Sequence, residues 1–290
     1  MANTREVKQR ISTAGNIAKI TKAMEMVSAS KMRKAQQQAL SSRNYTKALN
    51  QSLKILAPLI DDTLHPLLKQ GSSDRSLALV IATDRGLCGS LNQTLFKELT
   101  GWLKTHPNSE LITVGKKAML FCQFYGLPIF AQFNDLPDSI SINDIQPIVT
   151  LITNEFIENR TREVELFYMD FVNTLIQKPF RTQLLPIGQV MTTDEIEQLG
   201  EPKKTEYLFE PTPQVIFNNL LPYYVENTVY QAFLEAKASE HSARMVTMKN
   251  ASENADELID ELKLIFNKQR QASITNELLD ITTATLSLTN

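Results

Sequence analysis

The two ends of this 290-residue sequence are almost free of residues that interrupt helices. All 12 prolines fall within 58–222, and every glycine except Gly15 falls within 71–200. Because Gly and Pro are the residues that most disfavour a helix interior, residues 1–57 and 223–290 can each form one long helix. At about 1.5 Å per residue these helices would reach roughly 85 and 100 Å, more than a compact domain measures across. They must therefore pair, protrude or break, and Gly15 is the first position to examine for a local bend.

Cysteine, histidine and long apolar runs are also scarce. The two cysteines, Cys88 and Cys122, allow one disulfide, but we expect a reduced intracellular pair. The three histidines lack metal-ligand spacing, so we expect no metal, no catalytic histidine and no cofactor. Runs such as 77–82 are far shorter than the roughly 20 residues of a transmembrane helix. The first 30 residues contain Glu6 and Glu25, which disfavours a secretory signal.

Charge is divided unevenly along the chain, although the net charge is only −2. Residues 1–60 hold 11 Lys or Arg against two acidic residues, whereas 61–222 and 223–290 carry a net −7 and −4. A basic helix and an acidic helix of similar length are expected to pair, with an acidic partner beyond them. A solvated lysine-rich helix face would explain the same run and stays an alternative. We expect no nucleic-acid binding, because Tyr45 is the only aromatic residue in the basic segment.

Both terminal segments carry the steps of 4 and 3 that are typical of a coiled-coil seam. The N-terminal positions are Val7, Ile11, Ala14, Ala18 and Thr21, and Ile17, Ile20, Met24 and Val27 would widen the stripe. The C-terminal positions are Val225, Val229, Ala232, Ala236, Ser239, Ala243, Val246 and Asn250, resuming after an extra residue at Leu258, Leu262, Ile265, Gln269, Ala272, Asn276 and Leu279. Two such helices from opposite chain ends predict a long antiparallel coiled coil.

The middle of the chain alternates between strand and helix patterns. The apolar run 77–83 predicts a strand buried on both faces. Further strands are expected at 111–114, 129–133 and 164–171, with helices at about 92–106, before Tyr125 and at about 143–159. This order predicts a Rossmann-like α/β domain with a mostly parallel sheet. We divide the chain into an N-terminal shaft helix (1–58), the α/β domain (75–190), a connecting foot segment (191–222) and a C-terminal shaft helix (223–290).

The segment 84–92 (DRGLCGSLN) follows the first strand, where a nucleotide-binding loop would lie. It lacks the lysine of G-x-x-x-x-G-K-[ST] and the spacing of G-x-G-x-x-G. A nucleophilic Cys88 would need a base, and no histidine is near it in the sequence. A tight turn or a contact surface is the better interpretation, and catalysis by this domain is the weaker one.

Several long strings resemble the gamma subunit of F-type ATP synthases. They are residues 19–27 (KITKAMEMV), 29–34 (ASKMRK), 84–92 (DRGLCGSLN), 239–245 (SEHSARM) and 267–278 (NKQRQASITNEL). The resemblance spans nearly the whole chain. It implies a non-catalytic central-stalk rotor that couples proton flow through a membrane ring to ATP synthesis or hydrolysis at beta-subunit sites. The implied partners are the alpha, beta, epsilon and delta subunits and the membrane c-ring. The implied location is the cytoplasmic side of a bacterial inner membrane, since no organelle transit peptide is evident.

The resemblance also implies contact residues. Those expected to face the alpha/beta ring are Met24, Lys31, Arg33, Arg85, Cys88, Gly89, Arg270, Gln271 and Thr275. Those expected to face the membrane ring or epsilon are Tyr207, Phe209 and Glu210, with Phe209 standing where Tyr is common. Cys88 and Cys122 do not match the closely spaced regulatory pair of the chloroplast form, so thiol switching is not expected. A coiled-coil scaffold or adaptor with an α/β head is the main alternative, and a nucleotide-dependent enzyme is the third.

Overall fold

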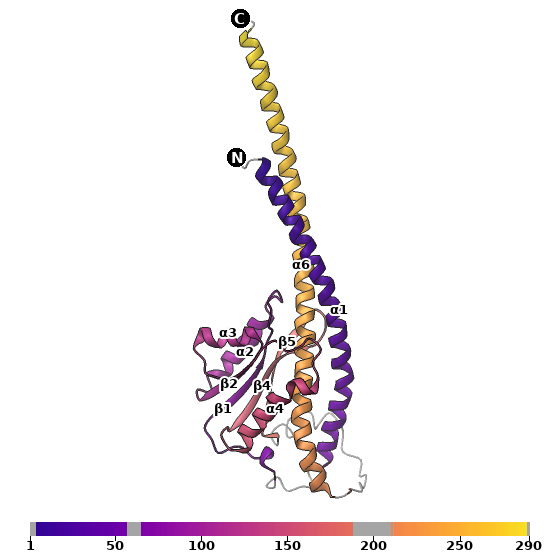
Figure 1. Ribbon diagram of the computed structural model, residues 1–290, viewed down its shortest axis with the longest axis vertical. Coiled ribbons are helices and arrows are strands. Elements are labelled where there is room, and N and C mark those ends of the chain that lie inside the picture. The colour runs from indigo at the N-terminus through magenta and orange to yellow at the C-terminus, as the bar shows by residue number, and fades with distance from the viewer. Residues whose placement is uncertain (1–3, 57–64, 188–209, 211, 289–290) are drawn as a thin grey trace. The chain divides into compact units, whose positions relative to one another are not determined.

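The structure, a computed structural model, describes residues 4–56, 65–187, 210 and 212–288 (Figure 1). The chain divides into two compact units: residues 1–28 with 245–290, called here the terminal-helix unit, and residues 29–244, called here the sheet unit. Two long helices, α1 (Thr4–Leu56) and α6 (Pro213–Leu288), each contribute to both units. The prediction of two long terminal helices is confirmed.

Helix α6 begins at Pro213, so the predicted start at residue 223 is wrong. The prediction treated Pro222 as a helix breaker, whereas Pro222 lies inside α6 with its side chain exposed. Its neighbours Leu221 and Val225 are fully buried. Their packing offsets the hydrogen bond that a proline removes from a helix. The last part of the predicted foot segment is therefore helical.

The sheet unit contains a five-stranded sheet in the order β3-β2-β1-β4-β5. The strands β1, β2, β3 and β4 pair in parallel, and β5 pairs antiparallel with β4. This confirms the Rossmann-like, mostly parallel architecture. The strands are β1 (Ser76–Ile81), β2 (Ser109–Val114), β3 (Ile129–Phe133), β4 (Glu163–Phe171) and β5 (Gln177–Leu185), and the shorter helices are η3 (Pro66–Leu68), α2 (Leu91–Leu103), α3 (Lys116–Tyr125) and α4 (Ile142–Ile157).

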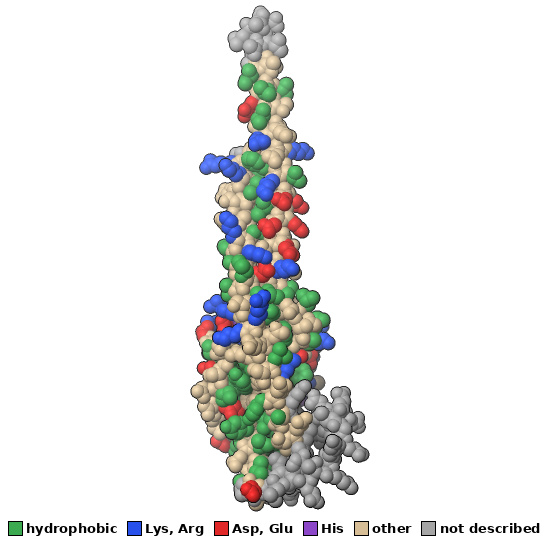
Figure 2. Space-filling model, turned by 90° about the vertical axis from the view of Figure 1, so that its right-hand side faces the viewer, with side chains coloured by type: hydrophobic (Ala, Val, Ile, Leu, Met, Phe, Trp, Pro, Cys, Tyr) green, Lys and Arg blue, Asp and Glu red, His purple; other side chains and the backbone are tan. Residues whose placement is uncertain are grey.

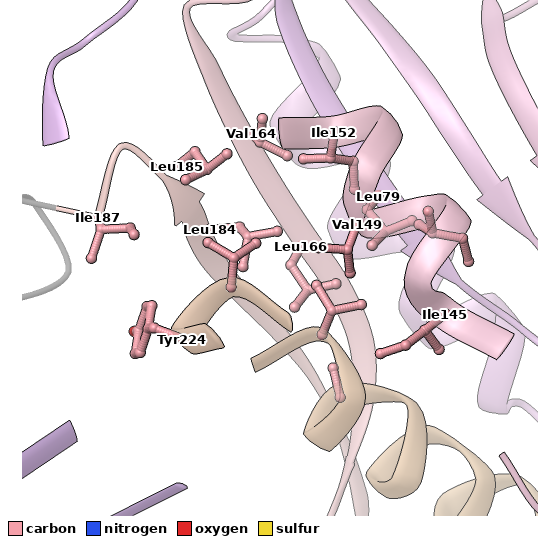
Figure 3. Close-up of a cluster of buried hydrophobic side chains, with 14 of the residues drawn as sticks. Leu79, Ile145, Val149, Ile152, Val164, Leu166, Leu184, Leu185, Ile187 and Tyr224 are labelled. Carbon is pink, nitrogen blue, oxygen red and sulfur yellow. The ribbon is translucent and has the colours of Figure 1, made fainter. Parts of the chain in front are cut away.

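Side chains of β1 alternate between two cores, one on each face of the sheet. Leu77, Leu79 and Ile81 pack with α4 and α6, whereas Ala78 and Val80 pack with α2 and α3. Figure 3 shows Leu79 with Val149 and Ile152 of α4, and Leu184 near Tyr224 of α6. Because both faces are covered, β1 is apolar throughout, as expected of a central parallel strand.

Strand β5 was not predicted from the sequence. It contains Pro179 and charged Lys178 and Arg181, and most of its side chains are exposed or half-buried. A proline is tolerated on an edge strand because one side of such a strand has no partner to receive hydrogen bonds. The strand is held instead by its antiparallel pairing with β4, which a local pattern does not reveal.

Within the sheet unit, the predicted seam of α6 packs in a core that includes the sheet as well as Leu49 and Leu53 of α1. Val225, Val229 and Ala232 are fully buried in the core with β1, β4 and α4. Further contacts with α1 come from a neighbouring face of α6, where the side chains are polar or small. They are Asn227 Nδ2 to Thr46 Oγ1 at 2.8 Å, Gln231 Nε2 to the Ala39 carbonyl at 3.4 Å, Arg43 Nε to Glu235 Oε1 at 3.1 Å, and the apolar cluster of Ala35, Ala238 and Phe171. Their order shows that α1 and α6 run antiparallel.

In the terminal-helix unit, the buried stripe of α6 is only partly the predicted one, since Val246, Leu262 and Gln269 are buried or half-buried as expected. Predicted members such as Asn250, Leu258 and Ile265 are exposed. Buried and half-buried positions in unbroken steps of 4 and 3 are Met248, Ser252, Ala255, Ile259, Leu262, Phe266 and Gln269, and Met245, Val246, Thr247 and Ala251 beside them are half-buried as well. The prediction continued the stripe of Val225, Val229 and Ala232 toward the C-terminus. The buried positions after residue 245 instead include Ser252, whose hydroxyl donates to the Ala18 carbonyl of α1 at 3.4 Å. Figure 2 shows positive and negative side chains both exposed along the long helices.

The predicted seam of α1 is confirmed by burial. Val7, Ala14 and Ala18 are buried, and Ile11 and Thr21 are half-buried. The expected widening residues Ile17, Ile20 and Val27 are about half exposed, so the stripe is narrower than predicted. The same steps continue through Glu25, Ser28, Met32, Ala35, Ala39, Ser42, Thr46, Leu49 and Leu53.

Candidate functional site

The turn between β1 and α2 is built by short polar side chains. Asn92 Nδ2 donates to Thr83 Oγ1 at 2.8 Å, and Thr83 Oγ1 donates to the Arg85 carbonyl at 2.8 Å. Gly89 and Leu87 both have positive φ, 61° and 62°, and glycine adopts that conformation at little cost. Gly89 is therefore needed for the shape of this turn.

Helix α6 fills the crevice at the carboxyl end of β1, where a doubly wound sheet would bind a ligand. Phe233, Ala236, Lys237 and Glu240 of α6 line that space together with Asp84. Asp84 Oδ1 accepts hydrogen bonds from the backbone N–H of Lys116 and of Asp135, at 3.0 and 3.3 Å. This arrangement supports the interpretation of 84–92 as a structural turn.

Arg244 of α6 clamps the turn. Its Nε donates to the Gly86 carbonyl and its Nη2 to the Arg85 carbonyl, both at 3.2 Å. Nη2 also lies 2.9 Å from Glu240 Oε1, and both charged side chains are nearly buried. Two residues earlier on α6, Ser242 Oγ donates to the Thr174 carbonyl in the β4–β5 hairpin, at 2.7 Å. One turn of α6 thus holds both loops at this edge of the sheet.

The three predicted contact residues of the turn differ in accessibility. Arg85 and Gly89 are exposed, as is the neighbouring Leu87 with 58% of its surface. Cys88 is only 3% exposed and packs in the core beside α2. Burial raises the pKa of its thiol, which keeps it protonated and unreactive. A partner contact thus stays a prediction for Arg85 and Gly89, whereas the Cys88 side chain supports the turn from inside.

The predicted contacts on α1 lie in different surroundings. Met24 is half-buried beside the seam, and Arg33 is exposed. Lys31 Nζ lies 2.6 Å from Asp138 Oδ2, in the loop between β3 and α4. His241 Nε2 of α6 lies 3.7 Å from the other oxygen of Asp138. Lys31 therefore links α1 to the sheet, a role that the sequence did not reveal.

The predicted C-terminal contacts share one exposed stretch of α6. Arg270, Gln271 and Thr275 are all exposed, and Thr275 Oγ1 donates to the Gln271 carbonyl at 3.0 Å. Large apolar side chains around them are exposed too. They include Ile274 (50%), Leu278 and Leu279 (both 60%) and Ile281 (65%).

Two of the three predicted foot contacts lie outside the residues that the structure describes. Tyr207 and Phe209 lie outside the described residues, and Glu210 is an exposed residue in a bend. Among the described residues, no group of His, Cys, Asp and Glu could hold a metal ion. No described helix is long and apolar enough to cross a membrane.

Sequence reasoning missed Arg244, Glu240 and Asp138. Arg244 and Glu240 lie within the string 239–245, but nothing local distinguishes them from ordinary helix-surface charges. The available signal was their position next to the small, buried residues Ser239 and Ala243 of the predicted stripe.

Comparisons with known proteins agree with this architecture. A family model described as ATP synthase matches residues 3–288. The ATP synthase gamma chain of Glaesserella parasuis serovar 5 (strain SH0165) is 42% identical over 285 residues, covering 97% of this chain and 98% of that protein. That of Dehalococcoides mccartyi is 41% identical over 284 residues, covering 97% of each.

Solved structures show the same fold at low identity. A chain of the Euglena gracilis mitochondrial ATP synthase (OSCP/F1/c-ring) matches with a TM-score of 0.66 and 20% identity, covering 98% of this chain and 94% of that chain. A chain of the Tetrahymena thermophila mitochondrial ATP synthase central stalk and c-ring matches with a TM-score of 0.60 and 24% identity, covering 80% and 99%. Taken with the bacterial relatives, these matches show that the chain belongs to the ATP synthase gamma-chain family.

Proposed function

We propose that this chain is the central-stalk rotor of a bacterial F-type ATP synthase. It has no active site of its own in that role. Proton flow through a membrane c-ring turns it, and the turning helices change the affinities of the beta-subunit sites for ADP, phosphate and ATP. Its partners would be the alpha, beta, epsilon and delta subunits and the c-ring. It would sit at the cytoplasmic side of the inner membrane, peripheral through the ring.

The observation that carries this proposal is the exposed end of α6. From residue 270 to 283 every described side chain is exposed, including Ile274, Leu278, Leu279 and Ile281. A helix that exposes this many large apolar side chains is normally covered by other protein. A ring of subunits would provide such surroundings.

Coupling requires that the rotor contact each conformational state of the ring differently. Arg270 and Gln271 are suited to such contacts, because a guanidinium and an amide donate directional hydrogen bonds from an exposed helix. Arg85 and Gly89 would add contacts from the β1–α2 turn, and Met24, Lys31 and Arg33 from α1. Glu210, with Tyr207 and Phe209, would meet the membrane ring or epsilon.

Co-purification tests the proposal. Affinity purification of the tagged chain from its own cells should yield alpha, beta and epsilon subunits, with ATP hydrolysis that the isolated chain lacks. ATP hydrolysis by the isolated chain would favour an enzyme, and recovery without alpha and beta would favour an adaptor.

Substitution at the α6 end tests the contacts. We expect Arg270→Ala and Gln271→Ala each to lower turnover of the complex about fivefold or more, the scale of an allosteric coupling. Lys104→Ala, an exposed lysine at the end of α2, is the control and should leave turnover unchanged. If turnover stays the same in both α6 variants, these two residues do not serve as coupling contacts.

A further inference from the structure

Three helices of the sheet unit enclose a groove that none of the expected contacts uses. It has a volume of about 310 Å³ and lies between α1, the start of α4 and residues 223–230 of α6. Its lining combines three tyrosines and one isoleucine with five polar or charged residues. The lining residues are Gln38, Ser41, Ser42, Tyr45, Ile142, Tyr223, Glu226, Asn227 and Tyr230.

Three tyrosine rings dominate the groove. Tyr45 and Tyr223 are 54% and 58% exposed, so their ring surfaces are open to a partner. Tyr230 is half-buried, and its hydroxyl donates to the Ile140 carbonyl at 3.3 Å, which fixes the ring. Asn227 Nδ2 donates to Thr46 Oγ1, which holds α1 and α6 together beside the groove. The three rings are therefore carried by α1 and α6, two helices that the hydrogen bond of Asn227 holds together.

Glu226 gives the groove a negative charge. It is half-buried, and among the described residues no lysine, arginine or histidine forms an ion pair with it. The neighbouring acidic residues differ, since Glu235 pairs with Arg43 and Asp138 with Lys31. The lining contains no basic residue. An uncompensated carboxylate beside aromatic faces attracts a cation by both ion pairing and cation–π contact.

We propose that this groove receives an arginine side chain of another polypeptide. The planar guanidinium would stack on Tyr45 or Tyr223 and donate to the Glu226 carboxylate, while further N–H groups reach Gln38 or Ser41. Arginine suits the site better than lysine, because its flat fork can stack and pair at the same time.

A side chain that belongs to a docked polypeptide fits this groove better than a free small cation. Two of the rings are more than half exposed, so they do not enclose a ligand as an aromatic cage does. Exposed cation–π contacts are weak, and a free cation would also lose its translational freedom. A side chain carried by a docked subunit loses little further freedom. The inference rests on the proposed function only in seeking the partner among subunits of the purified complex.

Photo-crosslinking in the assembled complex identifies the occupant. A benzophenone amino acid replaces Tyr45, which is exposed at the groove, and peptides joined to it are sequenced. We expect one subunit to crosslink, through a peptide with an arginine within a few residues of the attachment point. No crosslinked subunit, or a peptide without arginine, would overturn the proposal. Co-purification of alpha and beta in the same sample tests the proposed function independently of the crosslinking result.

Matched variants then test the chemistry. In chains that keep Tyr45 and carry no crosslinker, Tyr223→Leu and Glu226→Gln should each speed release of the subunit that crosslinking identified about 3- to 10-fold, because each removes one attraction. Tyr223→Phe keeps the ring and should release it at the wild-type rate. Since these side chains are exposed or half-buried, circular dichroism should show an unchanged fold. Unchanged release in Tyr223→Leu and Glu226→Gln, or equal acceleration by Tyr223→Phe and Tyr223→Leu, would contradict the proposed stacking and pairing.

Discussion

Arg244 of α6 donates a hydrogen bond from Nη2 to the main-chain carbonyl of Arg85, at 3.2 Å. The carbonyl belongs to the exposed turn after β1, whereas Arg244 is only 8% exposed. The same group pairs with Glu240, which is 6% exposed. The position of the turn therefore depends on a charged pair buried against the long helix.

Replacing Arg244 with leucine should destabilise the chain by about 2–4 kcal/mol, because it leaves the Glu240 charge and two carbonyls without their main partner. Lys237 Nζ, 3.6 Å from Glu240 Oε2, keeps part of the compensation. Urea unfolding followed by circular dichroism measures the loss. Arg33→Leu, at an exposed position of α1, is the control and should change stability by less than about 0.5 kcal/mol. Equal midpoints for both variants would show that the clamp contributes nothing.

Gly115→Ala should destabilise the sheet unit by about 2–4 kcal/mol. Gly115 has φ 87°, and an added Cβ would lie 2.4 Å from the Ala82 carbonyl oxygen, a backbone atom that cannot move freely. Gly126→Ala is the matched control. Its φ is 65°, but a Cβ there meets nothing within 4 Å, so it should cost only about 1–2 kcal/mol for the left-handed conformation. Thermal unfolding compares the two, and a larger loss at Gly126 would contradict the steric explanation.

Gly15→Ala should stabilise α1 by about 0.5–1 kcal/mol. The helix runs continuously through Gly15, and a Cβ there would meet nothing within 4 Å. Gly101→Ala in α2 has equally open space and should act in the same direction. Unfolding midpoints in urea measure both. A loss of stability at Gly15 alone would mean that this position needs the freedom of glycine, as a bend would.

As the pH rises from about 4 to about 6, the free energy of unfolding should fall because of Asp170. Burial, reinforced by a hydrogen bond and the charge of Glu235, raises the pKa of Asp170 to about 6, although Arg43 opposes the shift. The folded state therefore holds this proton more tightly than the unfolded chain, whose Asp pKa is about 3.9. The stabilisation is complete below the unfolded pKa and is lost as the pH rises through about 6. Asp170→Asn should flatten this part of the profile.

Asp144→Asn provides a control of opposite sign. Hydrogen bonds from Ser141 lower the pKa of Asp144, so this carboxylate stabilises the fold above its unfolded pKa and loses that effect as the pH falls. Unfolding midpoints from pH 3.5 to 7.5 measure both variants. An unchanged slope in Asp170→Asn would assign the acid-range dependence to another group.

The fold was predictable where burial dictates a local pattern. Strand β1 is covered on both faces and reads as a continuous apolar run, and α1 has one narrow buried stripe. Strand β5 and the start of α6 were not predictable, because pairing with β4 and packing around Leu221 override unfavourable local residues such as Pro179 and Pro222. Nor does a stripe on one helix specify all of its neighbours, which is why the packing of Val225 and Val229 with β1, β4 and α4 was not foreseen.

The candidate site was predictable only through motifs. The string 84–92 identified Arg85 and Gly89 as candidates. The burial of Cys88 depends instead on its packing against β1 and α2, which the string does not reveal. Arg244 and Asp138 act on groups more than 100 positions away in the sequence, so no local spacing could reveal them.

The unbroken stripe of α1 limits how the gene can change in length. Its buried positions keep steps of 4 and 3 from Val7 to Leu53, across both units. One inserted codon would turn every later side chain by about 100°, which would expose Leu49 and Leu53 and bury lysines instead. Seven inserted codons complete almost two turns and leave the stripe within about 20° of its partners. Natural length variation in this helix should therefore favour lengths that nearly restore the face, such as about 7, 11 or 18 residues, and other insertions should be matched by a deletion nearby.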